Sequence, residues 1–183
     1  MQRPAALRII DSAACTNVED MSKHTVILVR HAKAEHNAHK GDRERALTER
    51  GRNQSAELAR QISPLLQEVG AVLVSPAVRA RQTWEHMADA SGEAFPNPKV
   101  MDDIYGGDPE DIVEAVRMAG EGKVTVVVGH EPTISEAAQL IAEDPDALPW
   151  GVPTATAIIM SSSKDWKEWH RGVGENPQIV TAR

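Results

Sequence analysis

Three short runs of apolar, largely β-branched residues constrain the fold of this chain more than any other feature. They are Thr25–Val29, Ala71–Val74 and Lys123–Val128. Continuous runs of this kind are typical of strands that are buried on both faces of a parallel sheet. Segments with helical spacing of apolar residues lie between them. Strands that alternate with helices predict an α/β domain with three layers, α/β/α, around a mostly parallel central sheet.

Capping and turn residues place the helices between these strands. Thr48 is a suitable N-cap for a helix that we expect Pro64 to interrupt and Gly70 to end. The pair Ser75-Pro76 is typical of a helix start, with the serine as N-cap and the proline at the first helical position. Further elements are expected as a short edge strand at 99–101, helices from 109 to about 119 and from 133 to about 142, a strand at 154–160, and an edge strand or tail over 166–183.

The length of 183 residues fits one domain with a buried core, and we expect residues 24–183 to form it. Residues 1–23 show neither helical nor strand periodicity and are expected to form a loose N-terminal extension. Cys15 is the only cysteine, so no intrachain disulfide can form, which fits a reducing compartment. Nothing in the sequence predicts an oligomeric state.

Charge and hydropathy exclude several kinds of partner. The formal net charge of −7 argues against nucleic acid, although clustered arginines can still form a local site for an anion. No apolar run approaches the roughly 18 residues of a membrane helix, and the N-terminus lacks the apolar segment of a signal peptide. We therefore expect a cytoplasmic protein with no membrane partner.

Cationic side chains follow each of the three strands. Arg30-His31 follows the first, Arg79 lies shortly after the second, and His130 follows the third. Because ligands of open α/β sheets bind at the carboxyl ends of strands, these side chains are expected to share one pocket. Taken singly, each histidine could be a satisfied loop residue and Arg79 a solvated helix residue. Together they predict a site for an oxyanion with several negative charges.

These residues belong to a longer series of motifs, which are Val29-Arg30-His31-Ala32, Leu47-Thr48-Glu49-Arg50-Gly51, Ser75-Pro76 with Arg79-Ala80, Gln82-Thr83, Ile104-Tyr105-Gly106-Gly107-Asp108-Pro109 and Gly129-His130-Glu131-Pro132. The series resembles the histidine phosphatase superfamily, which includes phosphoglycerate mutases and acid phosphatases. The resemblance spans about residues 25–160 and is closest to the small phosphohistidine phosphatase branch, since the segment between the two histidines is short. It implies a phosphoglycerate mutase-like fold.

The resemblance implies a phosphatase in which His31 attacks phosphorus and forms a covalent phosphohistidine. The other ring nitrogen of His31 should donate to a backbone carbonyl. Arg30, Arg79 and a protonated His130 are expected to bind the phosphoryl oxygens, in the charge role that a metal plays elsewhere. We expect no cofactor and no metal, because His36 and a second histidine, His39, lack carboxylate or cysteine partners at metal-site spacing.

Two further residues have open roles. Asp103 is a candidate general acid for an alkoxide leaving group, and a solvated acid at a strand end is the alternative. Arg45 is a candidate phosphate or substrate contact, and a solvated loop arginine is the alternative. The favoured substrate is phosphohistidine in a protein. The alternatives are a phosphomonoesterase that acts on a small metabolite and a phosphate-binding module without turnover.

Overall fold

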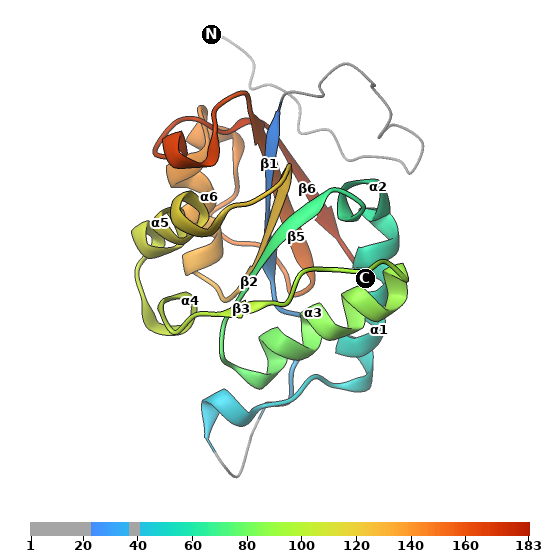
Figure 1. Cartoon of the computed structure of the whole chain (residues 1–183). Coiled ribbons are helices and arrows are strands. Elements are labelled where there is room, and N and C mark those ends of the chain that lie inside the picture. The colour runs from blue at the N-terminus through green and yellow to red at the C-terminus, as the bar shows by residue number, and fades with distance from the viewer. Residues whose placement is uncertain (1–22, 37–40) are drawn as a thin grey trace, which may run out of the picture.

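The computed structural model describes residues 23–36 and 41–183, and in it a six-stranded sheet lies between two layers of helices (Figure 1). The strand order is β3-β2-β4-β1-β5-β6. The first four of these run parallel to one another, whereas the fifth, β5, runs antiparallel to both of its neighbours, β1 and β6. The predicted α/β/α architecture is therefore confirmed. The strands are β1 (His24–Arg30), β2 (Val69–Val74), β3 (Lys99–Val100), β4 (Val124–Gly129), β5 (Thr156–Ser162) and β6 (Glu175–Thr181).

Helices cover both faces of the sheet, so the central strands are buried on both sides. In β1, Ile27 and Val29 face a core formed with α1 and α3, whereas Val26 and Leu28 face a second core formed with α5 and α6. This two-sided burial explains why the strands are continuous apolar runs. The helices are α1 (Glu49–Gln61), α2 (Ser63–Leu66), α3 (Val78–Ser91), α4 (Asp103–Gly106), α5 (Pro109–Ala119) and α6 (Thr133–Ile141), and short 3₁₀ turns are η1 (Asp42–Glu44), η2 (Pro145–Ala147) and η3 (Trp166–Glu168).

The helix after Thr48 differs from its prediction at one end. The Thr48 hydroxyl accepts from the Gly51 amide, as expected of an N-cap, and Pro64 lies at the start of a separate helix, α2. The prediction that Gly70 ends the helix is wrong, because α2 ends at Leu66 and Gly70 lies within β2. A Cβ at position 70 would lie 2.3 Å from the carbonyl oxygen of Glu121, so this glycine permits close backbone packing.

The predicted start of the next helix is also wrong in detail. The helix α3 begins at Val78 with Ala77 as its N-cap residue, and Ser75 does not cap it. The Ser75 hydroxyl instead lies 2.7 Å from Nε2 of His130 and accepts from the Ala77 amide at 3.3 Å. A contact with a residue distant in the chain thus replaces the local cap.

The remaining elements follow their predictions closely. Asp108 precedes α5 and forms a capping box with Asp111, β3 is an edge strand, and β6 is the edge strand expected in the C-terminal segment. The one-turn helix α4 was not expected. No helix in residues 23–36 and 41–183 is long and apolar enough to cross a membrane. Cys15, His39 and nearly all of the expected N-terminal extension lie outside the described residues.

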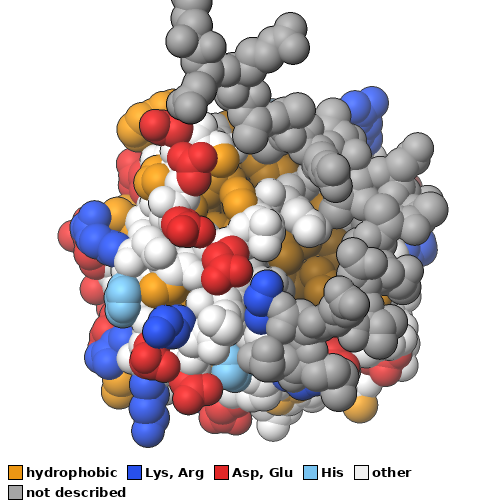
Figure 2. Space-filling view, turned by 90° about the horizontal axis from the view of Figure 1, so that it is seen from above, with side chains coloured by type: hydrophobic (Ala, Val, Ile, Leu, Met, Phe, Trp, Pro, Cys, Tyr) orange, Lys and Arg blue, Asp and Glu red, His pale blue; other side chains and the backbone are white. Residues whose placement is uncertain are grey.

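The face seen from above in Figure 2 carries acidic and basic side chains that are interspersed rather than sorted by sign. Apolar side chains lie among them. The part of this face that the described residues form is therefore unlike the continuous basic surface by which proteins bind nucleic acid.

Candidate active site

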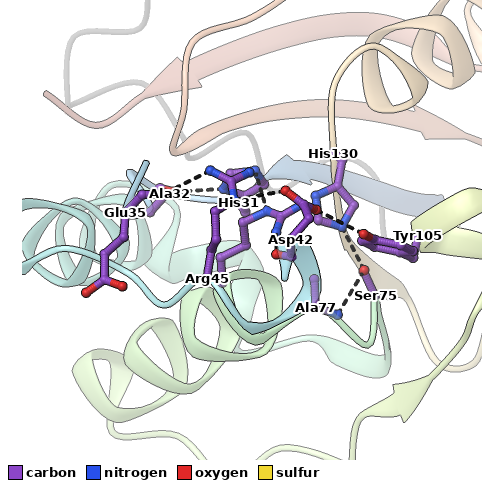
Figure 3. A network of polar contacts seen from close by, with 10 residues as sticks. His31, Ala32, Glu35, Asp42, Arg45, Ser75, Ala77, Tyr105 and His130 are labelled. Carbon is purple, nitrogen blue, oxygen red and sulfur yellow. Dashed lines mark hydrogen bonds and ion pairs between the residues drawn. The ribbon is translucent and has the colours of Figure 1, made fainter. Parts of the chain in front are cut away.

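The loops after β1, β2 and β4 bring the predicted residues together at the C-terminal edge of the sheet. The His31 amide donates to the Gly129 carbonyl at 3.0 Å, and the Ser75 amide donates to the Val128 carbonyl at 3.0 Å. These bonds extend the parallel pairing beyond the strands. As a result, the ring centroids of His31 and His130 lie 5.1 Å apart (Figure 3).

His31 is held in one tautomer. Its Nδ1 lies 2.7 Å from the Ala32 carbonyl oxygen, which can only accept, so Nδ1 carries the hydrogen, as expected from the sequence. The lone pair is on Nε2, which lies 3.2 Å from the donating Nε of Arg79. Burial lowers the pKa of His31 to about 4; the bond to Ala32 opposes this change, and the charges of Arg79 and Arg30 add to it. The ring is thus neutral near pH 7, and Nε2 can act as a nucleophile.

Arg79 lies in the first turn of α3, and its side chain is 5% exposed. In addition to the contact with His31, its Nη1 donates to the main-chain oxygen of Asp42 at 2.6 Å, and its Nη2 donates to the Asp42 carboxylate at 2.9 Å. The Thr83 hydroxyl donates to the Arg79 carbonyl and accepts from the Ala32 amide, which ties α3 to the loop of His31. A cation at a helix N-terminus is unfavourable on its own, and Asp42 provides the compensating anion.

Arg30 ends β1 and contacts the segment before β5. Its Nη1 donates to the Val152 carbonyl, and its Nε is buried with no hydrogen-bond partner among the described residues. Glu131 holds the same segment, since its carboxylate accepts from the Val152 amide and from the Ser135 hydroxyl. Burial raises the pKa of Glu131, and the bond from Ser135 opposes this change. Arg30 therefore has an unused donor within the site.

His130 follows β4 and faces His31. Its Nε2 contacts the Ser75 hydroxyl at 2.7 Å, and the Tyr105 ring packs edge-on against it with 5.5 Å between centroids. Its Nδ1 is buried without a partner among the described residues. Burial, the neighbouring His31 and the charge of Arg79 lower the pKa of His130 to about 3, so the ring is neutral without an anion. A bound phosphoryl dianion would favour its protonated form.

Asp42, on the turn η1, is the point at which several donors of the site meet (Figure 3). Its Oδ1 accepts from Nε of Arg45 at 2.9 Å, and its Oδ2 accepts from the Tyr105 hydroxyl at 2.9 Å and from Arg79. Desolvation alone would raise the pKa of Asp42, but the hydrogen bonds from Arg79 and Tyr105 outweigh it and lower the pKa to about 2. Arg45, which also donates to the Glu35 carbonyl at 2.8 Å, is therefore part of the site.

Asp103, the candidate general acid, lies apart from this network. It is exposed at the start of α4, and its carboxylate has no hydrogen bond or ion pair with any described residue. Its neighbour Asp102 pairs with Arg43 at 3.0 Å, and the Arg43 guanidinium stacks over the Tyr105 ring at 4.4 Å. This segment thus contributes a phenol to the site instead of a carboxylic acid.

Sequence reasoning missed three members of the network: Asp42, Ser75 in its contact with His130, and Tyr105 as a donor. Tyr105 lies within a motif that the sequence analysis quoted, whereas no local signal marked Asp42. The described residues contain no group of three or more histidine, cysteine or acidic side chains arranged to hold a metal ion.

Comparison with known proteins identifies the family of this chain. The sequence profile of the histidine phosphatase superfamily (branch 1) matches residues 26–117. MT1313, an uncharacterized protein of Mycobacterium tuberculosis, is 34% identical over 116 residues, which are 62% of this chain and 70% of that protein.

Two solved structures extend the comparison. A putative phosphohistidine phosphatase SixA from Nakamurella multipartitia is 25% identical, with a TM-score of 0.71 over 88% of this chain and 95% of that chain. The mycobacterial glucosyl-3-phosphoglycerate phosphatase Rv2419c shares the fold at 16% identity, with a TM-score of 0.54 over 87% of this chain and 98% of that chain. With the family profile matched across half its length and the histidine–arginine site assembled at the sheet edge, the chain belongs to the histidine phosphatase superfamily (branch 1).

Proposed function

We propose that this phosphatase uses His31 as its nucleophile, needs no metal, and removes the phosphoryl group from phosphohistidine in a protein. The observation that carries the proposal is the state of Nε2 of His31. This atom carries the lone pair of the ring, because Nδ1 holds the hydrogen that is donated to the Ala32 carbonyl, and in this structure it accepts from Nε of Arg79 at 3.2 Å. A nucleophile and an oxyanion-binding group therefore lie side by side, as phosphoryl transfer requires.

In the first step, Nε2 of His31 attacks phosphorus in line with the leaving group. A bond forms between Nε2 and phosphorus, and the bond from phosphorus to the substrate nitrogen breaks. The substrate imidazole has taken a proton from solvent on its other ring nitrogen before this step, so it retains the electron pair of the broken bond and leaves as a neutral ring. Arg79 and Arg30 stabilise the charge on the equatorial oxygens, and His130 adds a third cation when the dianion has raised its pKa.

In the second step, water attacks the phosphohistidine on His31. The bond between Nε2 and phosphorus breaks, inorganic phosphate is released, and the lone pair returns to Nε2. The hydrogen bond from Nδ1 to Ala32 is kept throughout, so the ring stays oriented for the next cycle.

The substrate class follows from the acid–base groups around the nucleophile. An alkoxide leaving group requires a proton, and such general-acid help typically contributes 10²–10⁴-fold. The pKa of Asp42 is about 2, so its carboxylate has no proton to donate at neutral pH. Asp103 is exposed on α4 and makes no contact with the site. An imidazole can be protonated before it leaves, so phosphohistidine suits this site better than an alkyl phosphate.

Two alternatives are tested with the same protein. The fold also accommodates a metabolite phosphatase, since Rv2419c shares it, so a small phosphomonoester is the first alternative. A phosphate-binding module without turnover is the second. We expect kcat/KM for phosphohistidine to exceed that for sugar phosphates, and activity to persist in EDTA. A reversed preference would favour the metabolite phosphatase, and activity lost in EDTA and restored by a divalent ion would refute metal independence.

The nucleophile is tested with labelled substrate and a quench in alkaline detergent, because phosphohistidine is stable in base and hydrolyses in acid. The parent protein should carry an acid-labile phosphoryl group, and His31→Ala should carry none and lose turnover while remaining folded. His36→Ala is the matched control, since His36 is an exposed histidine on the same loop. A labelled His31→Ala variant, or one with activity within tenfold of the parent, would refute the assignment. Absence of both label and turnover in the parent would leave only the binding module.

A further inference from the structure

The carboxylate of Asp42 forms an ion pair with Arg79, one of the cations that the proposed reaction needs. Its Oδ2 accepts from Nη2 of Arg79 and from the Tyr105 hydroxyl, each at 2.9 Å, and its Oδ1 accepts from Nε of Arg45 at 2.9 Å. The main-chain oxygen of Asp42 also accepts a hydrogen bond from Nη1 of Arg79. One residue thus accepts from both terminal nitrogens of the buried guanidinium.

The position of the third guanidinium nitrogen, Nε, indicates where a substrate must bind. Nε of Arg79 is 3.2 Å from Nε2 of His31, so a phosphorus atom within reach of Nε2 places its oxygens beside the same guanidinium. Bidentate binding of a phosphoryl group uses two N–H groups of one arginine edge. At least one of these is on a terminal nitrogen that Asp42 occupies in this structure. A phosphoryl dianion and the Asp42 carboxylate therefore compete for the same donors.

The 3₁₀ turn that carries Asp42 is not buried and follows a glycine, so the carboxylate can move away from Arg79. Residues Asp42–Glu44 form a single 3₁₀ turn, and none of them is buried. Gly41, just before the turn, has a φ of 107°, a region that glycine enters readily. The side-chain contacts of this turn are hydrogen bonds, ion pairs and the stacking of Arg43 on the Tyr105 ring, and none of its residues is buried, so it can move without exposing apolar core.

We propose that Asp42 is an internal anion that occupies the phosphoryl-binding donors of the free enzyme and is displaced by the substrate. The inference rests on the proposed function only in taking these donors as the phosphoryl site. Displacement requires a group that replaces both the charge and the paired geometry of the carboxylate. A phosphoryl dianion meets this requirement, whereas a singly charged ester binds too weakly to compete. Asp42 is thereby a specificity-determining residue that disfavours weakly charged ligands.

The test compares Asp42→Asn with the parent in the binding of inorganic phosphate and orthovanadate, by calorimetry and by inhibition. Asparagine keeps a hydrogen-bond acceptor of the same size but removes the charge. The Asp42 side chain is 52% exposed, so water and salt screen part of its attraction to Arg79. We expect Asp42→Asn to bind both anions about threefold to tenfold more tightly, with a matching fall in KM and a smaller change in kcat.

Glu44→Gln is the matched control, because Glu44 is an exposed carboxylate on the same turn. It should leave phosphate affinity within twofold of the parent, which separates the effect of the Asp42 contact from a general loss of negative charge. Weaker binding by Asp42→Asn would overturn the inference and show that Asp42 positions Arg79 instead. Unchanged affinity, or no phosphate binding by either protein, would overturn it as well.

These experiments distinguish a failure of the proposed function from a failure of the proposed role of Asp42. Phosphate binding is measured without turnover, so a tighter Asp42→Asn variant supports the inference even if His31 never becomes labelled. Conversely, a labelled His31 with unchanged phosphate affinity in Asp42→Asn supports the proposed function and refutes the role of Asp42.

Discussion

Replacing Arg79 by lysine tests whether the catalytic site depends on a guanidinium rather than on positive charge alone. Arg79 uses three nitrogens at once: Nε donates to His31, Nη2 to the Asp42 carboxylate, and Nη1 to the main-chain oxygen of Asp42. A lysine ammonium donates from a single point and cannot span His31 and an oxyanion together. The substitution keeps the charge but removes the paired geometry.

The expected loss of activity follows from the hydrogen bonds that Arg79→Lys removes. A hydrogen bond to a charged group contributes about 1.5–3 kcal/mol, and loss of one oxyanion donor typically costs about 2.7–4 kcal/mol of transition-state stabilisation. Because the ammonium retains part of this interaction, we expect Arg79→Lys to lose about 2–3 kcal/mol. This corresponds to about a 30- to 150-fold fall in kcat/KM. Inhibition by vanadate should weaken in parallel, since vanadate occupies the same donors.

Stability should respond much less than activity. The anionic partner of Arg79 is a carboxylate with a 52% exposed side chain, which water can solvate when the guanidinium is gone. We therefore expect the free energy of unfolding to fall by about 1 kcal/mol, measured by urea denaturation. Arg81→Lys is the control, since Arg81 is an exposed arginine on the same helix. If Arg79→Lys kept kcat/KM within threefold of the parent, the assignment of Arg79 to the phosphoryl site would be refuted.

Two further predictions concern the histidines. Because the pKa of His31 is lowered to about 4, the ring loses its nucleophilic form only as the pH falls through about 4. After correction for substrate ionisation, kcat/KM should show no transition from His31 between pH 5 and 7. A midpoint near 6.5 in the rate of His31 labelling, measured with an alkaline quench, would contradict this. Ser75→Ala removes the 2.7 Å partner of His130 and should lower kcat/KM about tenfold, with vanadate inhibition weakened to match. Unchanged kinetics would show that Ser75 does not position the ring.

The parts of the site that follow strands were predictable, because short apolar runs mark buried strands and parallel strands end at a common edge. The positions of His31 and His130 follow from that rule. The contacts of Asp42 do not, since its partner Tyr105 lies 63 residues away and is reached through a loop without periodicity. The role of Ser75 was obscured for a related reason, since its hydroxyl serves His130 instead of the adjacent helix.

The placement of Asp103 depends on a short helix that the sequence did not indicate. Successive residues of an α-helix are rotated by about 100° around the axis, so two residues separated by one position lie on nearly opposite sides. On α4 the Tyr105 hydroxyl reaches Asp42, so the Asp103 side chain is directed away from the site and is exposed. Asp103 was a candidate because the resemblance to the mutases of the superfamily places their general acid at about this point in the chain, and that resemblance does not specify the local helix.

The resting charges of the site explain how a chain with a net charge of −7 can bind an anion. Burial lowers the pKa of His31 to about 4 and of His130 to about 3, so neither ring adds positive charge at neutral pH. Asp42 offsets Arg79, and Arg30 donates to a neutral carbonyl. An incoming dianion can change two of these states, by displacing the Asp42 carboxylate from Arg79 and by favouring protonation of His130. The affinity of the site is therefore set by local burial and pairing, and the total charge of the chain does not determine it.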